Sequence, residues 1–483
     1  MASLKSEAIF ILISLEKLVR VFCIMLFVSL FGQEVMGQVI LMDTVYFAGS
    51  EQAEKDALEL NKLIKNVSGP TTIIIEKGRY VFNQPIQLKS NVHLVGEQKD
   101  SVIIECDLNG KGDLFRVSGS KEKAQFQVKN SISQGSFEIV VENSKVFSSG
   151  DVIRLFKVKP DVELSDWAKN DIGQILYINQ VTDSSIKCNR GIRLDYEIHE
   201  ELRIEVLKPI ENTFIKNLIV KRKDETELQT SNFYFSYARN CGISDVTSVN
   251  CNFSHVTLDY SINIKIDKVD CYNGFSHGNG GKSYGVSLQF TSTDCIVQNC
   301  IFRKLRHGIV FQSGANGNTV RANYFLEGFW EDVRLPKYAA GDIVLHGNYP
   351  NFNSIEGNLC NQIVVDNSHG LNGPGNEIKN NRTNNYGIFI GRKSTENIAV
   401  TRNDIVKVNI FKGKIKCAVK AATILDNRRK GKLYKPQSQL DVICREVREM
   451  NLVLYNIGLP CNFNSFYNAA FFRYNSSFIS TIN

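Results

Sequence analysis

The chain has 483 residues, of which 43% are hydrophobic and 22% are charged, and its formal net charge is +7. The hydrophobic fraction is ample for a core, and the length allows either three ordinary domains or one elongated repeat structure. Lysines and arginines are scattered and often adjacent to acids, a distribution that argues against a nucleic-acid-binding surface.

Residues 1–37 have the pattern of an export signal. Lys17 and Arg20 precede an apolar run at 21–31, and small residues at Val35 and Gly37 suit a cleavage before Gln38. The run is too short to span a bilayer comfortably, so we expect no stable membrane insertion. We therefore expect a secreted protein, periplasmic or extracellular; the alternative is that this segment is a buried strand.

Residues 38–136 are predicted to form an N-terminal cap and the first coils of a solenoid. Ser50 is expected to cap a short helix with Ala53, Ala57, Leu60 and Ile64 on one face. An amphipathic helix is a simple cover for the open end of a stack of strands. Short strands are expected after it, at 72–75, 80–82, 86–88, 92–95 and 102–105.

The spacing of the strand-like stretches changes between residues 137 and 213. Strand-like stretches there are separated by long polar connections. This pattern favours an inserted β subdomain, with irregular coils of the same solenoid as the alternative.

A repeat dominates residues 214–406. Its element is an apolar residue followed three positions later by Asn, and the Asn-to-Asn steps are 24, 35, 23 and 22 residues. The longest step contains 328–340, which we interpret as a loop inserted into one coil. Asn318, Asn353 and Asn376 give a second match two residues before the apolar position. The main pairs are Ile296/Asn299, Val320/Asn323, Ile355/Asn358, Ile378/Asn381 and Val400/Asn403.

This period predicts an all-β, right-handed parallel β-helix of coils of about 22 residues. Leucine-rich repeats need a leucine ladder and helical repeats need longer units with helical patterning, and neither occurs. In a parallel β-helix equivalent side chains stack about 4.8 Å apart, so a buried Asn can bond its neighbours in the coils above and below. We expect the five Asn residues of the main pairs to form one column. Beyond 407 the repeat fades, and the tail at 407–483 is expected to cover the far end.

The sequence holds twelve cysteines, or eleven if Cys23 leaves with the signal. Cys251, Cys271 and Cys295 recur at steps of 20 and 24, which predicts equivalent places in successive coils. We expect buried, unpaired thiols that act as small apolar side chains. No Cys or His cluster has zinc spacing, so no metal site is predicted.

A row of polar side chains is the candidate site. Because side chains alternate along a strand, Gln289, Gln312, His346 and Asp366 are expected to point outward from neighbouring coils. A carboxylate beside an imidazole raises the pKa of the ring and orients it, as a general acid or base requires. We predict His346 and Asp366 as the catalytic pair; the alternative is a row that merely keeps the surface soluble. The aligned strands are 286–289, 309–312, 343–346, 363–366 and 388–391.

A neighbouring outward row is apolar and consists of Val310, Val344, Val364 and Phe389. Four stacked apolar residues should not face water. The row therefore indicates a covering segment, an oligomer partner or a face on which a sugar ring lies.

Further residues are candidates for substrate binding because they lie on loops or rows beside this face. Trp with charged neighbours on a loop suits stacking on a saccharide, although the same loop would also suit simple packing on the helix. His369 lies in an Asn-Gly-rich turn, where a structural role is the alternative. The candidates are Gln289, Gln312, Arg306, His307, Trp330, Arg334, Lys337 and His369.

Several segments resemble the pectate-lyase-like parallel β-helix superfamily over roughly residues 45 to 405. They are Glu76 to Tyr80, Asn91 to Glu97 and the Asn-punctuated coils, and the segments 341–358 and 364–376 are similar to those of secreted bacterial members. Members are often polysaccharide lyases or glycoside hydrolases, and some are non-catalytic binders or tailspike-like fibres.

The departures from that pattern leave the reaction open. Arg334-Leu335-Pro336-Lys337 is only faintly similar to an Arg-x-Pro element of lyases, and no three Asp residues align as calcium ligands. Asp366 is followed by Asn367, not by the second Asp of polygalacturonases. No cofactor is identified from the residues, and calcium is implied by the resemblance alone. The sequence thus predicts a secreted carbohydrate-active protein, a lyase or hydrolase of an extracellular, uronate-containing polysaccharide. A non-catalytic carbohydrate binder and a surface fibre remain the alternatives.

Overall fold

The structure is a computed structural model that describes residues 42–405, except 279, 332–340 and 392, together with short strands between 414 and 445. The expected signal at 1–37 and most of the tail at 407–483 lie outside the described residues. In the described part of the chain, no helix is long and apolar enough to cross a membrane.

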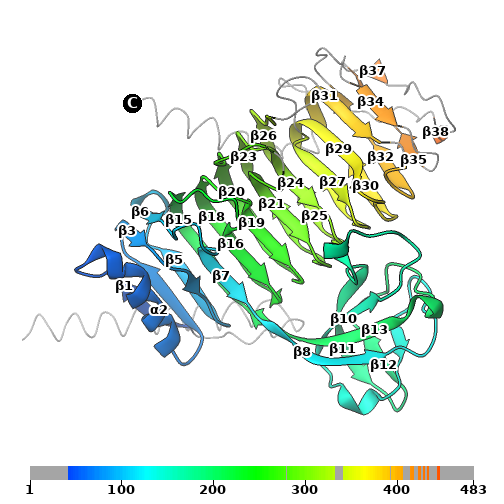
Figure 1. Cartoon of the computed structure of the whole chain (residues 1–483), viewed down its shortest axis with the longest axis horizontal. Helices are drawn as coiled ribbons and strands as arrows, with labels where there is room; N and C mark the ends of the chain where they lie inside the picture. Colours follow the sequence, from blue (N-terminus) through cyan, green and yellow to red (C-terminus); the bar gives the residue numbers. More distant parts are fainter. Residues whose placement is uncertain are drawn as a thin grey trace, which may run out of the picture. The chain divides into compact units, whose positions relative to one another are not determined.

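The strands of the repeat form three stacks of parallel strands, called stacks A, B and C below (Figure 1). Stack A contains β1 (Asp43–Phe47), β2 (Thr71–Ile75), β5 (Val92–Gly96), the first halves of β15 (Phe214–Arg222), β18 (Gly242–Val249) and β20 (Lys265–Tyr272), then β22 (Ile296–Gln298), β25 (Thr319–Arg321), β28 (Ser354–Glu356), β30 (Asn376–Lys379), β32 (Ile398–Thr401), β35 (Ala422–Leu425) and β38 (Ile443–Arg445).

Stack B contains β3 (Gly78–Phe82), β6 (Val102–Cys106), the second halves of β15, β18 and β20, then β23 (Ile301–Arg303), β26 (Tyr324–Leu326), the first residues of β29 (Leu359–His369) and β31 (Arg382–Ile390), β33 (Asp404–Ile405) and β36 (Arg428–Arg429), which also pairs with β37 (Lys432–Leu433).

Stack C contains β4 (Ile86–Gln87), β7 (Phe115–Ser118), β16 (Ser231–Ser236), β19 (Ser254–Asp259), β21 (Tyr284–Gln289), β24 (His307–Phe311), β27 (Ile343–Gly347), the second halves of β29 and β31, and β34 (Lys414–Cys417). Through β34, β35 and β38 the stacks continue past residue 406, where the repeat was expected to end.

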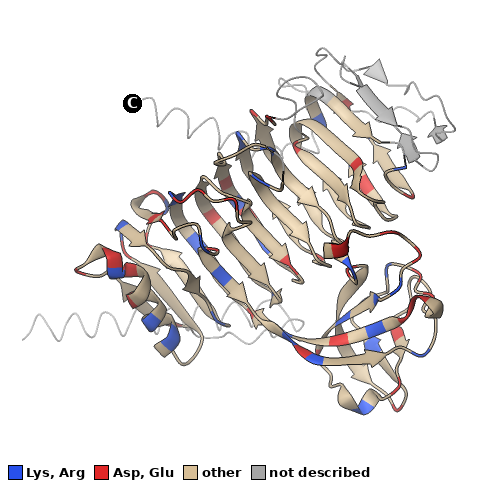
Figure 2. Cartoon of the chain, in the orientation of Figure 1, with Lys and Arg blue, Asp and Glu red and all other residues tan. Residues whose placement is uncertain are grey.

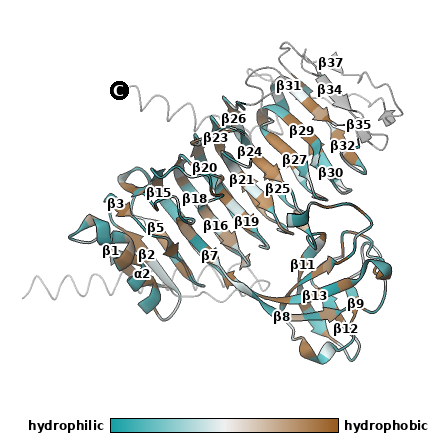
Figure 3. Ribbon diagram, in the orientation of Figure 1, coloured by the Kyte–Doolittle hydropathy of each residue, from teal (hydrophilic) through white to brown (hydrophobic). Residues whose placement is uncertain are grey.

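The core lies between the three stacks and consists of the inward residues of every coil. Aliphatic side chains dominate it, and the strands carry most of the apolar residues (Figure 3). Aromatic rings also stack from coil to coil: Phe115 lies 5.3 Å from Phe233, and Phe302 lies 4.8 Å from Phe325 between ring centroids. Because side chains alternate, each strand that packs on this core presents its other residues outward.

The helix α2 (Asp56–Asn66) provides the expected apolar face, with Ala57, Leu60 and Ile64 fully buried in the core. The predicted start was wrong. Ala53 lies in the preceding 3-10 turn η1 (Ala53–Lys55) and is exposed, and the Ser50 side chain does not cap the helix. Instead the buried Asp56 carboxylate accepts hydrogen bonds from the backbone N–H of Ser50 at 2.8 Å and of Val81 at 3.0 Å.

Two ladders of buried Asn run along the stack, at the two ends of the short stack A strands. Each Asn Oδ1 accepts from the backbone N–H of the residue one coil earlier, and each Nδ2 donates to a backbone carbonyl. The bonds of both ladders measure 2.8–3.1 Å. One ladder contains Asn318, Asn353 and Asn376, and the other contains Asn323, Asn358, Asn381 and Asn403.

Asn299 is not in the column, so that part of the prediction was wrong. Strand pairing places Val297 opposite Val320, which puts Cys300 in the ladder and Asn299 one residue before it. Asn299 occupies the corner position that Ala322, Gly357, Asn380 and Arg402 occupy in later coils, all with φ between 54° and 63°. This left-handed residue turns the chain from stack A into stack B.

The eight cysteines between Cys106 and Cys360 are buried, as expected. They do not share one position in the coils, however. Cys271 lies in stack B, opposite Ser248 and Phe302 in the strand register, whereas Cys295 lies at the start of one Asn ladder. The thiols at Cys295 and Cys300 take the place of Asn. The Sγ of Cys300 accepts from the Val269 N–H and donates to the carbonyl of Gln298 at 3.1 Å.

The chain leaves the stack after β7 and returns at β15, which pairs directly with β5 and β6. Between them lies an insertion, a six-stranded antiparallel sheet with its own apolar core. It begins at 120, earlier than the expected 137, because the polar strand after β7 already belongs to it. Its strands are β8 (Ser120–Gln127), β9 (Glu138–Val140), β10 (Val152–Lys157), β11 (Gly173–Val181), β12 (Ser185–Cys188) and β13 (Leu202–Lys208).

Charges of both signs are interspersed over the stack and the insertion (Figure 2). In this view Lys and Arg form no continuous basic stripe, in keeping with the scattered charge of the sequence.

Candidate functional site

The outward face of stack C carries the predicted polar row. Phe311, Leu345 and Val365 pair across β24, β27 and β29 and are fully buried in the core. The residue after each, Gln312, His346 and Asp366, therefore faces outward. The predicted register is confirmed at these three coils.

His346 and Asp366 form a hydrogen-bonded pair. The Nδ1 atom of His346 lies 2.9 Å and 3.1 Å from the two carboxylate oxygens of Asp366. A second bond at 3.0 Å, from the N–H of Ser368, orients the carboxylate. Burial alone would raise the pKa of Asp366. The hydrogen bond and the charge of His346 outweigh burial and lower this pKa below its ordinary value, so the carboxyl stays ionised. In the neutral ring, Nδ1–H donates to Asp366 and leaves Nε2 as the basic atom.

Two more histidines lie beside this pair. The ring centroid of His346 is 4.9 Å from that of His369 and 6.1 Å from that of His307. His307 is buried and bonds the carbonyl of Gly341 at 2.8 Å, and burial with the nearby charges of Arg306 and His346 lowers its pKa to about 3. The pKa of His369 is also lowered by burial and by the charge of His346. Both rings are therefore neutral walls of the site.

Arg306 is a buried cation without an acidic partner among the described residues. Only 6% of the residue is exposed. The guanidinium donates to the carbonyl of Gly278 at 2.8 Å and lies over the rings of Trp330, at 4.5 Å, and Tyr284, at 5.7 Å. The Nε of Arg306 and the Nε1 of Trp330 are both buried, and neither has a hydrogen-bond partner among the residues that the structure describes. Such a site has spare donors and positive charge for an anionic ligand.

The row continues from Gln312 away from the His–Asp pair. Gln312 donates to the Oε1 of Gln289 at 2.5 Å, and Gln289 in turn bonds Asp259. Both glutamines are less than a tenth exposed. They face outward from the sheet and are largely covered, so their contact with a ligand stays a prediction.

The apolar row is partly covered by the chain itself. Val310 packs with Phe253 and Tyr284 in a small cluster outside the main core, and Val344 is also buried. Val364 and Phe389 are half-buried. Of the three expected explanations, a covering segment accounts for the first two residues.

The insertion forms one wall of this face. Trp167, in the 3-10 turn η4 (Asp166–Ala168), is 45% exposed and has its ring 5.4 Å from His369 and 6.0 Å from Phe290. Sequence reasoning missed Trp167, because nothing in the polar stretch around it indicated that it would reach stack C.

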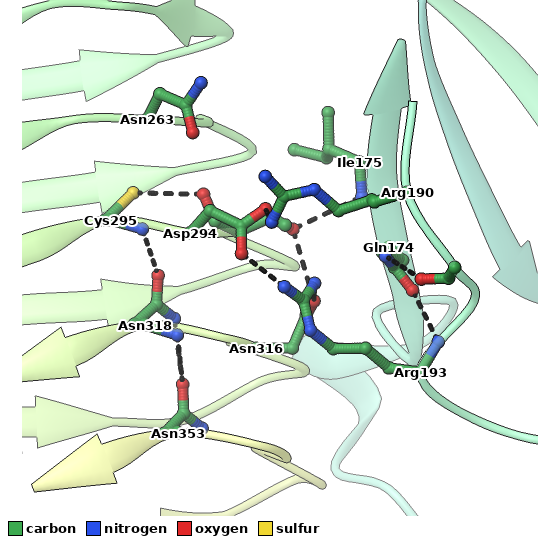
Figure 4. Close-up of polar contacts among 12 residues, drawn as sticks. Gln174, Ile175, Arg190, Arg193, Asn263, Asp294, Cys295, Asn316, Asn318 and Asn353 are labelled. Carbon is green, nitrogen blue, oxygen red and sulfur yellow. Dashed lines mark hydrogen bonds and ion pairs between the residues drawn. The ribbon is translucent and has the colours of Figure 1, made fainter. Parts of the chain in front are cut away.

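Polar contacts fix the insertion to the coils (Figure 4). Asp294 pairs with both Arg190 and Arg193 of the insertion, and Arg193 also donates to the Oδ1 of Asn316 at 2.9 Å. The buried Asp171 bonds Tyr260 at 3.1 Å and the hydroxyl of Ser313. Asp171 therefore fixes the insertion to the turns that follow stack C, in addition to Arg190 and Arg193.

Two predicted residues, Arg334 and Lys337, lie outside the described residues. Within the described residues no group of three or more His, Cys, Asp or Glu is placed to hold a metal ion. Asp259 and Asp366 are separated on the row by Gln289, Gln312 and His346. These residues do not fit the calcium site that the superfamily resemblance implied.

Sequence reasoning also missed Asp259, although β19 has the pattern of the strands that were aligned. Val256, Leu258 and Asp259 of β19 pair with Val286, Leu288 and Gln289 of β21. Extending the alignment by one coil would have placed Asp259 on the polar row.

No family model matches the chain, and no curated protein sequence matches it. Solved structures do: the tailspike gp61 of Pseudomonas phage phi297 has a TM-score of 0.57 at 12% identity, covering 83% of this chain and 77% of that chain. The tailspike gp49 of Pseudomonas phage LKA1 has a TM-score of 0.53 at 14% identity, covering 80% and 74%. These likenesses concern the fold. It is a right-handed parallel β-helix.

Proposed function

We propose that this protein is a carbohydrate-active enzyme, a polysaccharide lyase or glycoside hydrolase, that acts on an extracellular, uronate-containing polymer. The observation that carries the proposal is the His346–Asp366 pair at 2.9 Å, on the face that also holds Arg306, a cation with no acidic partner in the described part of the chain. Trp167 and Trp330 flank this face, and indole rings suit the apolar side of a sugar.

The arrangement suits elimination at a uronate. A lyase removes the proton next to the carboxylate, a carbon–carbon double bond forms, and the bond to the leaving sugar oxygen breaks. The Nε2 of His346 is the base in this scheme, held in its tautomer by Asp366. Arg306 neutralises the substrate carboxylate, which lowers the energy of the charge that develops when the proton leaves.

The test is turnover of a panel of acidic and neutral polysaccharides. Lyase activity appears as ultraviolet absorbance of unsaturated products, and hydrolysis as new reducing ends without that absorbance. We expect H346A and D366N to lower kcat by about 10²–10⁴-fold, the usual contribution of general acid–base catalysis, with little change in thermal midpoint. R306M should raise KM for acidic polymers.

A matched control is available in the insertion. His199 and Asp161 form a pair with the same 2.9 Å separation, but both side chains are more than half exposed and lie elsewhere. H199A should leave turnover unchanged. Full activity in H346A would reject the pair as the reaction centre.

A second candidate is a polysaccharide-binding or fibre protein without turnover. It is favoured by the small exposure of the His346 side chain, 12%, which leaves little room for a substrate in this arrangement. Two tailspikes share the fold, which is compatible with this candidate. Tight binding of a polymer by wild type and H346A alike, without products, would select it. A stable oligomer in sedimentation would assign the half-buried Val364 and Phe389 to an interface between copies.

We also propose that residues 1–37 direct export and are removed before Gln38. The support is the basic, apolar and small-residue order of this segment. Expression in a bacterial host and mass spectrometry of the secreted protein should find a mature N-terminus at Gln38. Full-length protein retained in the cell would contradict export.

A further inference from the structure

A pocket lies on the face of stack C, on the N-terminal side of the His–Asp pair. Its volume is about 240 Å³, and its walls include Arg116, Tyr234, Asp259 and Gln289. Ligand sites for drug-sized molecules measure about 300–1,000 Å³, so this pocket suits a single small ring. Asp259 and His346 occupy the same row with the coils of Gln289 and Gln312 between them. Three coil spacings of about 4.8 Å separate them by roughly 14 Å.

Asp259 is the distinctive group of this pocket. It is 6% exposed, its Oδ2 accepts from the Tyr234 hydroxyl at 2.8 Å, and Gln289 also bonds it. Its Oδ1 is buried and has no hydrogen-bond partner within the described part of the chain. A buried carboxyl oxygen without a partner costs free energy unless a ligand or water satisfies it.

The surroundings of Asp259 favour its protonated form. Burial, with a smaller contribution from the nearby carboxyls of Asp113 and Asp171, outweighs the hydrogen bonds from Tyr234 and Gln289 and raises the pKa of Asp259 to about 7. A protonated carboxyl carries an O–H that can donate to a ligand oxygen.

The pocket has no unbalanced cation. Arg116 pairs with Asp113 at 2.6 Å and lies over the Tyr234 ring at 4.9 Å. Phe253 and Phe290 add apolar walls to the hydroxyl and carboxyl groups. This combination of ring surfaces and neutral hydrogen-bonding groups fits a sugar with hydroxyls and no carboxylate. The site at Arg306 has the opposite character, because no acid among the described residues pairs with its cation.

We propose that this pocket binds an uncharged sugar unit of the same polymer, so that the substrate is a heteropolysaccharide with neutral and acidic residues. This proposal rests on the proposed function, because that function supplies the polymer to which the neutral sugar belongs. The chain would lie along the stacking axis, with a neutral unit against Asp259 and a uronate against Arg306. Asp259 acts as a hydrogen-bond donor to a sugar oxygen.

Ligand-observed NMR on the full chain tests this directly. The probes are glucose, galactose and mannose, with glucuronate, galacturonate and mannuronate as their acidic counterparts. We expect at least one neutral sugar to bind wild type and to lose at least tenfold in affinity between pH 6 and pH 8.5, as Asp259 loses its proton. D259N, whose amide still donates, should bind without this pH dependence, and D259L should not bind.

The controls separate this site from the proposed reaction centre. H346A and R306M should keep neutral-sugar binding, whereas R306M should lose binding of the uronates. D161N, at an exposed Asp of the insertion, should behave as wild type. If D259L does not fold, the contrast between wild type and D259N decides the matter.

The proposal is overturned if no neutral sugar binds wild type, or if binding in wild type is independent of pH. Neutral-sugar binding that is lost in H346A but kept in D259L would also overturn it. If H346A retains full turnover while the neutral sugar follows Asp259, the reaction centre is wrong and the pocket stands.

Discussion

The Asn ladder makes a strong prediction about stability at Asn358. Its Oδ1 accepts from the Asn323 N–H at 3.0 Å, and its Nδ2 donates to the carbonyl of Val320 at 3.0 Å and to Asn381 at 2.9 Å. Asn358 is fully buried, so water cannot replace these bonds. N358A would leave the Asn323 N–H and the Val320 carbonyl without this partner.

Each buried group left unsatisfied costs about 1–3 kcal/mol, so the two together should lower the free energy of unfolding by about 2–6 kcal/mol. The loss should be local at first, because each coil contacts only its neighbours. We therefore expect faster amide exchange at Asn323 and in the adjoining strands β25 and β28 before global unfolding changes.

Urea unfolding followed by circular dichroism measures the global effect, and hydrogen-exchange mass spectrometry measures the local one. N130A is the matched control, because Asn130 is an exposed Asn in the insertion. A cost below about 0.5 kcal/mol, within the range of surface substitutions, would refute the role assigned to the ladder.

Three further predictions concern other buried polar groups. C300N should leave the thermal midpoint unchanged or raise it, since Cys300 occupies a ladder position, while C300L should lower it; equal losses in both would contradict the ladder assignment. Burial raises the pKa of Asp342 to about 7, against about 3.9 unfolded, so its stabilising contribution is complete below pH 4 and is lost as pH rises through 7. Relative to D342N, the wild type should lose up to about 4 kcal/mol between pH 4 and pH 8 in urea unfolding, and parallel pH curves would show that the carboxyl is not shifted. D294A removes the shared partner of Arg190 and Arg193 and should speed proteolysis within 120–208; cleavage at the wild-type rate would show that this pairing does not hold the insertion.

The fold was predictable because its physical cause repeats along the sequence. An Asn in each coil satisfies the backbone at the corner that no strand reaches, so its period marks the coil length. The phase failed at one coil, where Ile296 and Val297 are both apolar but only Ile296 has an Asn three residues later, because Cys300 takes the ladder position after Val297. Burial settles the choice: Val297 is fully buried and Ile296 is not. One ambiguous pair of apolar residues was enough to misplace Asn299.

The candidate pair His346 and Asp366 was predictable because strand alternation and coil register are both local rules. The rest of the site depends on contacts between distant segments. Trp167 reaches the face from the insertion, more than a hundred residues before His346 in the chain. Arg306 precedes its strand, so alternation does not say that its guanidinium turns toward Trp330.

The insertion therefore decides what the face of stack C can do. Without it, the row would be an open sheet surface, and the side chains of Thr291 and Asn316, which bond Asp171 and Arg193 in the turns after stack C, would face water. With it, Trp167 stands beside His369, one ring away from the catalytic candidate His346. On the proposed function, loosening the insertion should weaken substrate binding before it alters the His346–Asp366 pair, since that pair lies wholly on β27 and β29. D294A should accordingly raise KM more than it lowers kcat, whereas D366N should do the reverse.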